Sequence, residues 1–211
     1  MNETISQINE IRNLMERSTR FLSLSGLSGV AAGVTALIGA AVAYFYLDFG
    51  VRYFDSTTYF TDDLYLKIPQ AIYFLALDGI LVLIVAVGLA SIFTIRKTKK
   101  SGNKIWSPVG KKLIVQLLIP LASGGFFCLL LFYHRVFFLI APATLIFYGL
   151  ALLNASKYTL REIQWLGISE IVLGLLSALM IGYGLVFWSI GFGLLHIIYG
   201  IAMYLKYDVN K

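Results

Sequence analysis

Three ionisable side chains lie inside long apolar stretches of this 211-residue chain: Asp78, Glu170 and His196. A charge left unpaired in hydrocarbon costs a few kcal/mol or more, so such groups pair with one another or mark a path for protons or ions. At about 1.5 Å of helix per residue, all three fall within several Å of the midplane of a membrane. The sequence therefore indicates a midplane polar centre that responds to protons or cations.

The alternative is that these residues only hold helices together. Glu170 and His196 lie on helix faces made of small residues, which are Gly167, Gly174 and Ser177 for the first and Ser189, Gly193 and Gly200 for the second. Both side chains should face neighbouring helices, and a hydrogen bond or ion pair between them is plausible. Because such polar pairs also stabilise membrane bundles, the sequence leaves both interpretations open.

Other site chemistry finds little support in the sequence. Cys128 is the one cysteine, which excludes an internal disulfide and a CxxC motif. His134 is expected in an outer turn and cannot face His196 across a haem, and no HExxH or ExxH metal signature occurs. No nucleophile, base and oxyanion donor can be assembled. We therefore expect no cofactor, no metal and no covalent chemistry.

The elements that carry these residues are six apolar stretches. With 59% hydrophobic and 13% charged residues, the composition lies outside the soluble globular range. Each stretch is near the ~20 residues that a membrane-spanning helix needs. The predicted fold is an all-α membrane bundle with spans at about 21–47, 69–95, 113–133, 136–154, 163–182 and 185–205. Residues 1–20 are predicted to form a short amphipathic helix on the membrane surface, the alternative being a frayed polar tail.

The basic residues are divided unequally between the two sides of this bundle. Of the 17 Lys and Arg residues, only Arg52, Lys67 and Arg135 fall on one side. The positive-inside rule then places both termini in the cytoplasm, with the bundle in the cytoplasmic membrane. The net charge of +6 indicates attraction to anionic lipid headgroups rather than to nucleic acid. The connection over 96–112 is expected to bind anionic lipid or a cytoplasmic partner through Arg96, Lys97, Lys99, Lys100, Lys104, Lys111 and Lys112.

Short turns predict that the six helices form three hairpins. Only His134 and Arg135 separate the third and fourth spans, and only Tyr183 and Gly184 separate the fifth and sixth. A Gly-Leu/Ile-Ala triplet near the inner end of each even-numbered span suggests a hairpin repeat, or coincidence. Pro120 is expected to interrupt the third span, and Pro142 the fourth.

Small residues are expected to let the helices approach closely. The glycines assigned to helix packing are Gly26, Gly29, Gly33, Gly167, Gly174, Gly193 and Gly200. If these faces met another protein instead, the chain would be an accessory or scaffold subunit, with a membrane-protein partner or a homo-oligomer. This is the alternative to the leading hypothesis, a membrane protein that transports, senses or regulates.

Residues 15–29, MERSTRFLSLSGLSG, resemble the start of uncharacterised six-span membrane proteins encoded in Bacteroidota-type genomes. That resemblance implies a six-span fold and no activity. The three-hairpin layout is also similar to that of the HdeD-type acid-resistance membrane proteins. This second resemblance concerns layout alone and carries no site residue over.

Overall fold

The computed structural model describes residues 21, 24–51, 62–100, 102 and 106–209. Throughout this part of the chain the regular elements are helices, which confirms the predicted all-α class. The surface helix predicted over 1–20 lies outside the described residues, as do Arg52 and Lys104. Side chains are described for residues 24–47, 70–100 and 106–209, with Phe21 and Gly102 in addition.

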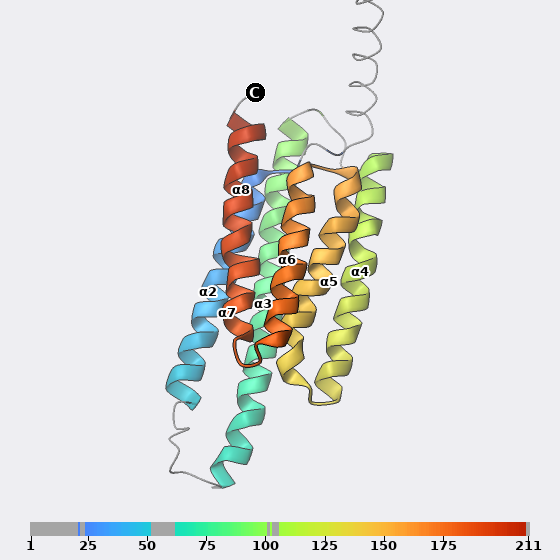
Figure 1. The fold of residues 1–211 in the computed structure, drawn as a ribbon. Helices are drawn as coiled ribbons and strands as arrows, with labels where there is room; N and C mark the ends of the chain where they lie inside the picture. Colours follow the sequence, from blue (N-terminus) through green and yellow to red (C-terminus); the bar gives the residue numbers. More distant parts are fainter. Residues whose placement is uncertain (1–20, 22–23, 52–61, 101, 103–105, 210–211) are drawn as a thin grey trace, which may run out of the picture.

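Six helical segments run lengthwise through the bundle (Figure 1). They are α2 (Gly26–Val51), α3 (Asp62–Lys100), α4 (Pro108–Tyr133), α5 (Ile140–Ala155) with the 3₁₀ turn η1 (Phe137–Leu139) before it, α6 (Arg161–Leu179), and a last segment. The last segment joins α7 (Gly184–Trp188), the π-helical η3 (Ser189–Leu195), α8 (His196–Tyr204) and η4 (Leu205–Val209). Among the described residues, these six segments are long and apolar enough to cross a membrane.

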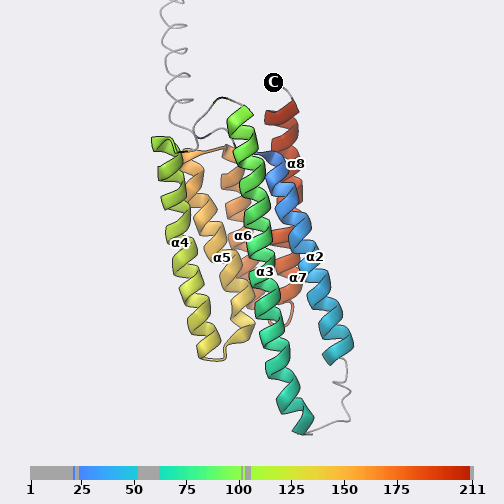
Figure 2. The same ribbon diagram turned by 180° about the vertical axis from the view of Figure 1, so that it is seen from behind.

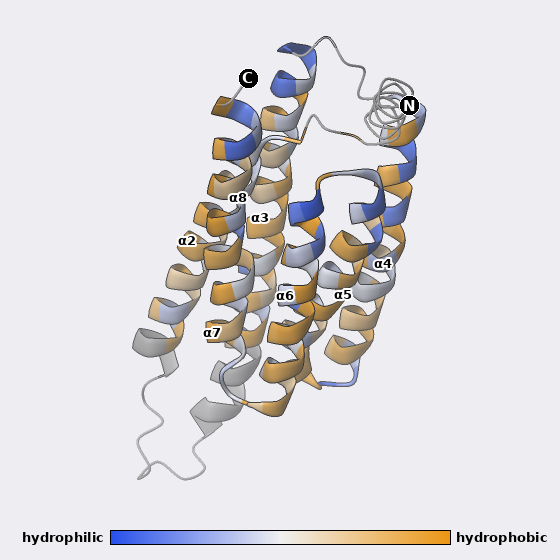
Figure 3. Cartoon of the chain, turned by 45° about the horizontal axis from the view of Figure 1, so that its top comes forward, coloured by the Kyte–Doolittle hydropathy of each residue, from blue (hydrophilic) through white to orange (hydrophobic). Residues whose placement is uncertain are grey.

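Large apolar side chains cover the outside of this bundle. Leu179 is 80% exposed, and Leu77, Ile84 and Leu129 are also well exposed. In Figure 3 hydrophobic residues form a band around the middle of the helices, and hydrophilic residues collect where the C-terminus lies. Water would penalise an apolar surface of this extent, whereas lipid tails would cover it at no cost. The surface is therefore compatible with a membrane helical bundle.

The helices pack in two groups. In the first, α5 lies between α4 and α6; in the second, α2 lies between α3 and the last segment (Figures 1 and 2). The last segment packs more extensively on α2 than on α6, its neighbour in the chain. Glycine explains this pairing, because side chains added at Gly26 and Gly29 would meet the backbone of Gly200. Gly33 lies equally close to the carbonyl of Gly193.

The first helix begins at Gly26, five residues after the predicted start. Phe21 is not helical and lies beside the 3₁₀ turn η2 (Ser156–Tyr158), which connects α5 and α6. Its N–H donates to the carbonyl of Tyr158 at 2.7 Å, and its carbonyl accepts from Thr159 Oγ1 at 2.9 Å. These bonds satisfy backbone groups that a helix would otherwise have to pair.

Cationic side chains mark one end of the bundle, which we name the basic end: Arg96, Lys97, Lys99, Lys100, Lys111, Lys112, Lys157, Arg161 and Lys206. The predicted basic connection over 96–112 is largely helical, because α3 continues to Lys100 and α4 starts at Pro108. Lys97 turns inward, where it donates to the carbonyl of Leu24 at 2.5 Å and pairs with Asp208. Asp208 also accepts from the N–H of Gly26 at 3.2 Å. One lysine therefore ties α2, α3 and the C-terminal turn together.

The two prolines have different effects. Pro142 lies in the first turn of α5, where backbone N–H groups have no hydrogen-bond partner within the helix. Its missing N–H therefore costs no helical hydrogen bond, and Pro142 marks the start of α5 instead of interrupting a helix. Pro120 lies inside α4 and deprives the carbonyl of Gln116 of its helical partner. Asn154 of α5 replaces that partner: its Nδ2 donates to the Gln116 carbonyl at 3.0 Å and to Gln116 Oε1 at 2.5 Å.

Replacing Asn154 by leucine is expected to lower the free energy of unfolding by about 1–3 kcal/mol, because the Gln116 carbonyl loses its donor. In a Pro120→Ala background the same change should cost less, since residue 120 regains an N–H for that carbonyl. Thermal unfolding in detergent of the wild type, the two single variants and the double variant measures the coupling free energy between positions 120 and 154. An equal cost in both backgrounds would show that Asn154 does not compensate for Pro120.

Candidate polar centre in the bundle

Glu170 is the most completely buried ionisable group in the described part of the chain, with 0% exposure. It lies in the middle of α6, about 13 Å along the helix from Arg161. Its carboxylate is in contact range of Gly191, where an added Cβ would overlap it. Neither carboxylate oxygen has a hydrogen-bond partner among the described residues. A polar group buried in this way is uncommon and calls for a physical reason.

His196 is the nearest ionisable neighbour of Glu170. The imidazole is buried, with Nδ1 3.4 Å from Glu170 Oε1 and 3.0 Å from the carbonyl of Gly191. Because that carbonyl can only accept, Nδ1 must carry a hydrogen. Nε2 lies 2.7 Å from the hydroxyl of Tyr148 and accepts from it when the ring is neutral. Both ring nitrogens are thus fixed in place.

Tyr148 completes the centre from α5, and the sequence reasoning missed it. Its ring lies 5.3 Å from that of His196 and 5.0 Å from that of Phe192, between centroids. The sequence did contain a signal for it. Tyrosines of membrane proteins gather at the membrane interfaces, whereas Tyr148 lies midway along the apolar helix Phe137–Tyr158. A hydroxyl at that depth needs a partner inside the bundle.

The π-helical turn η3 forms the side of the centre that faces the Glu170 carboxylate. It spans Ser189–Leu195 and directs the carbonyl of Gly191 to the His196 ring. A side chain at position 191 would collide with the Glu170 carboxylate and come within 2.5 Å of Leu145. Single π-helical turns inside α-helices are often found at functional sites. Glycine and the irregular turn together make room for the carboxylate.

The structure places Asp78 elsewhere. Asp78 is half-buried on α3 and lies against α2, where its Oδ2 is 3.5 Å from a Cβ built on Gly39. The Glu170 and His196 side chains meet where α5, α6, η3 and α8 pack together. Of the three residues proposed from the sequence, Glu170 and His196 are therefore brought together and Asp78 is not.

The arrangement of Tyr148, His196 and Glu170 can hold a proton at more than one atom. A carboxylate on Glu170 is tolerable in this setting when His196 is charged, because the two charges are 3.4 Å apart. With a neutral ring, a proton on Glu170 removes the buried charge instead. Residues for a metal are lacking over the described ranges, where no three His, Cys, Asp or Glu side chains gather. The chemistry available is proton binding and transfer.

Over the described residues the fold defines a class, a helical bundle with six apolar helices compatible with a membrane. No protein-family model, curated protein or solved structure matches the chain. The residues of the centre are therefore the basis for assigning a function.

Replacing Tyr148 by phenylalanine is expected to leave the fold intact and lower the free energy of unfolding by about 1–3 kcal/mol, because His196 Nε2 loses its buried partner. The ¹⁵N chemical shift of His196 Nε2 should change at the same time. Tyr199→Phe is the matched control, since the described residues offer the Tyr199 hydroxyl no hydrogen bond. An unchanged Nε2 shift in the Tyr148 variant would exclude the bond.

Proposed function

We propose that this is an integral membrane protein of transport or sensing type that binds and releases a proton at the Glu170, His196 and Tyr148 centre. The observation that carries the proposal is the position of Glu170, fully buried, without a hydrogen bond among described residues, and 3.4 Å from His196. A carboxyl that served only to join helices would be expected to accept hydrogen bonds from the neighbouring helix.

The distribution of charge supports a topology for this function. With cations concentrated at the basic end, we place that end and both termini in the cytoplasm, and the bundle in the bacterial inner membrane. The connections of three residues between α4 and η1 and of four between α6 and α7 are consistent with the hairpin layout. The centre then lies near the bilayer midplane, where a proton bound from either side changes the charge inside the membrane.

Trp188 supplies a probe for this proposal, because its ring lies 5.0 Å from Phe192, which in turn stacks on His196 at 6.0 Å. In a Trp106→Phe and Trp165→Phe background, emission from Trp188 is expected to change with pH. Glu170→Gln should abolish that change. Glu162→Gln is the control, because Glu162 bonds to Lys206 and Tyr207 at the basic end.

Proteoliposomes separate transport from sensing. If the wild-type protein dissipates a pH gradient and Glu170→Gln does not, the centre carries protons across the membrane. If only the Trp188 emission depends on Glu170, the centre senses pH. If neither property depends on Glu170, the proposal fails.

An accessory role is the second candidate, and α3 is the helix that favours it. Gly26 and Gly29 of α2 pack against Gly200 of α8, whereas Cβ atoms built on Gly79 and Gly88 of α3 have nothing within 4 Å among the described residues. Such an open, mostly apolar helix could contact a partner membrane protein or a second copy of the chain. Mass measurement of the gently purified protein tests this, because a stoichiometric partner or dimer is expected in that case.

A further inference from the structure

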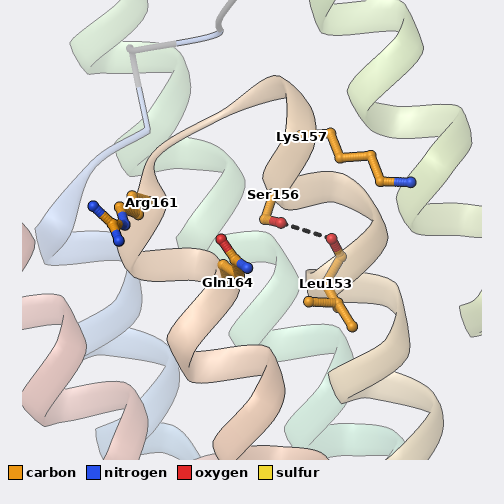
Figure 4. A pocket seen from close by; sticks show the side chains of 5 residues that line it. All are labelled: Leu153, Ser156, Lys157, Arg161 and Gln164. Carbon is orange, nitrogen blue, oxygen red and sulfur yellow. Dashed lines mark hydrogen bonds between the residues drawn. The ribbon is translucent and has the colours of Figure 1, made fainter.

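A polar pocket opens at the basic end, away from the midplane centre. Its volume is about 470 Å³, and it is lined by Leu153, Ser156, Lys157, Arg161 and Gln164. The lining residues come from the end of α5, from η2 and from the first turn of α6 (Figure 4). Ser156 and Gln164 lie in the middle, and Lys157 and Arg161 stand at opposite edges with their charged ends directed outward (Figure 4).

Among the described lining residues there are two positive charges and no negative one. Lys157 and Arg161 are exposed, and within the described ranges neither forms an ion pair. Glu162, which follows Arg161 in the sequence, is held by Lys206 at 2.7 Å and by Tyr207 at 3.0 Å. The described residues therefore leave the positive charge at the pocket without a partner, and this charge favours an anion with several acceptor oxygens.

The position of the pocket indicates where that anion comes from. It lies where α5 ends and α6 begins, at the boundary of two apolar helices. Trp165, which directly follows Gln164, is 52% exposed, as expected for an aromatic side chain at headgroup level. Leu153 adds an apolar wall beside the amide and hydroxyl groups. A phosphate attached to a glycerol backbone and acyl chains has this mixture of charge and apolar surface.

We propose that this pocket binds a phosphate ester, supplied by the headgroup of an anionic phospholipid, and that the exposed side chains of Lys157 and Arg161 turn in from the two edges to contact the phosphate oxygens. A soluble glycerol phosphate has the same chemistry and is the other possible source. The site is separate from the predicted lipid contacts over 96–112 and does not depend on the proton-binding function.

Native mass spectrometry of the protein from mixed micelles of phosphatidylglycerol and phosphatidylcholine tests the proposal. The wild-type protein is expected to retain phosphatidylglycerol preferentially. Lys157→Gln with Arg161→Gln should reduce that preference about tenfold or more, since charge-assisted hydrogen bonds are lost. Both side chains are exposed, so the variant should fold normally, which its melting temperature checks.

Arg135→Gln is the control, because it removes an exposed charge at the opposite end of the bundle, outside the pocket and outside the 96–112 connection. It should leave the preference nearly unchanged. An equal loss in the pocket variant and in this control, or no lipid preference in the wild type together with no binding of glycerol phosphate, would overturn the proposal. A different result is that glycerol phosphate binds more tightly than the lipid, with this binding lost in the pocket variant. That result would support the phosphate site and identify the soluble compound as its ligand.

Discussion

Replacing Glu170 by leucine is expected to raise the stability of the bundle and to abolish its response to pH. The carboxyl is fully buried and its oxygens have no hydrogen bond from the described residues, so its removal relieves a cost of about 1–3 kcal/mol. Leucine is similar in size and fits the apolar surroundings, which include Leu145. Replacing a whole buried ion pair by apolar residues has this effect in other proteins. Here the His196 ring can stay neutral without Glu170, because it keeps the Gly191 carbonyl and the Tyr148 hydroxyl as partners.

The paired outcome separates a functional residue from one that joins helices. A gain in melting temperature with a loss of the Trp188 pH response would identify Glu170 as a group retained at a cost to stability. Ser177→Ala is the control, since Ser177 is a second buried polar group on α6 without a partner in the described structure. That variant should keep the pH response. A less stable Glu170→Leu protein with an unaltered pH response would support helix association instead.

Replacing Gly149 by alanine is expected to cost about 1–3 kcal/mol or more, because it overpacks a contact in which the backbones of α5 and α6 approach closely. A Cβ there would lie 2.6 Å from the carbonyl of Gly167 and 2.9 Å from the N–H of Ile171. Both are backbone atoms, so no side chain can turn aside. Gly167→Ala should behave alike, since its Cβ would lie 2.8 Å from the Gly149 carbonyl.

Gly88 and Gly125 provide the matched controls for this prediction. A Cβ built at either position has nothing within 4 Å among the described residues, although both lie inside apolar helices. Alanine there should be neutral or should stabilise by about 0.5–1 kcal/mol, because glycine weakens helix interiors. Thermal unfolding in one detergent compares the four variants. Equal effects at the close and open positions would mean that α5 and α6 do not pack as described.

The apolar helices could be predicted from the sequence because membrane length and continuous hydropathy specify them almost independently of context. Their ends were less predictable. Phe21 is apolar and was assigned to the first span, yet it extends to Tyr158 and Thr159, bonds that no local pattern reveals. Likewise, Arg96 and Lys97 are helical in α3 rather than part of a loop.

The centre was only partly foreseeable. Small residues at three- and four-residue steps indicated that Glu170 and His196 point inward, and the structure places them 3.4 Å apart. The pattern identifies the inward face of a helix but not the helix that packs against it. The sequence therefore could not show that Asp78 lies apart from Glu170 and His196. The π-helical turn η3 and its Gly191 carbonyl depend on packing against α5 and α6, which hydropathy does not encode.

The most direct test of the proton-binding centre is an infrared difference spectrum of the reconstituted protein between two pH values. We expect a carboxyl C=O band that changes with pH, is absent in Glu170→Gln, and is altered in Tyr148→Phe through His196. Identical pH-dependent carboxyl bands in the wild type and in Glu170→Gln would contradict it.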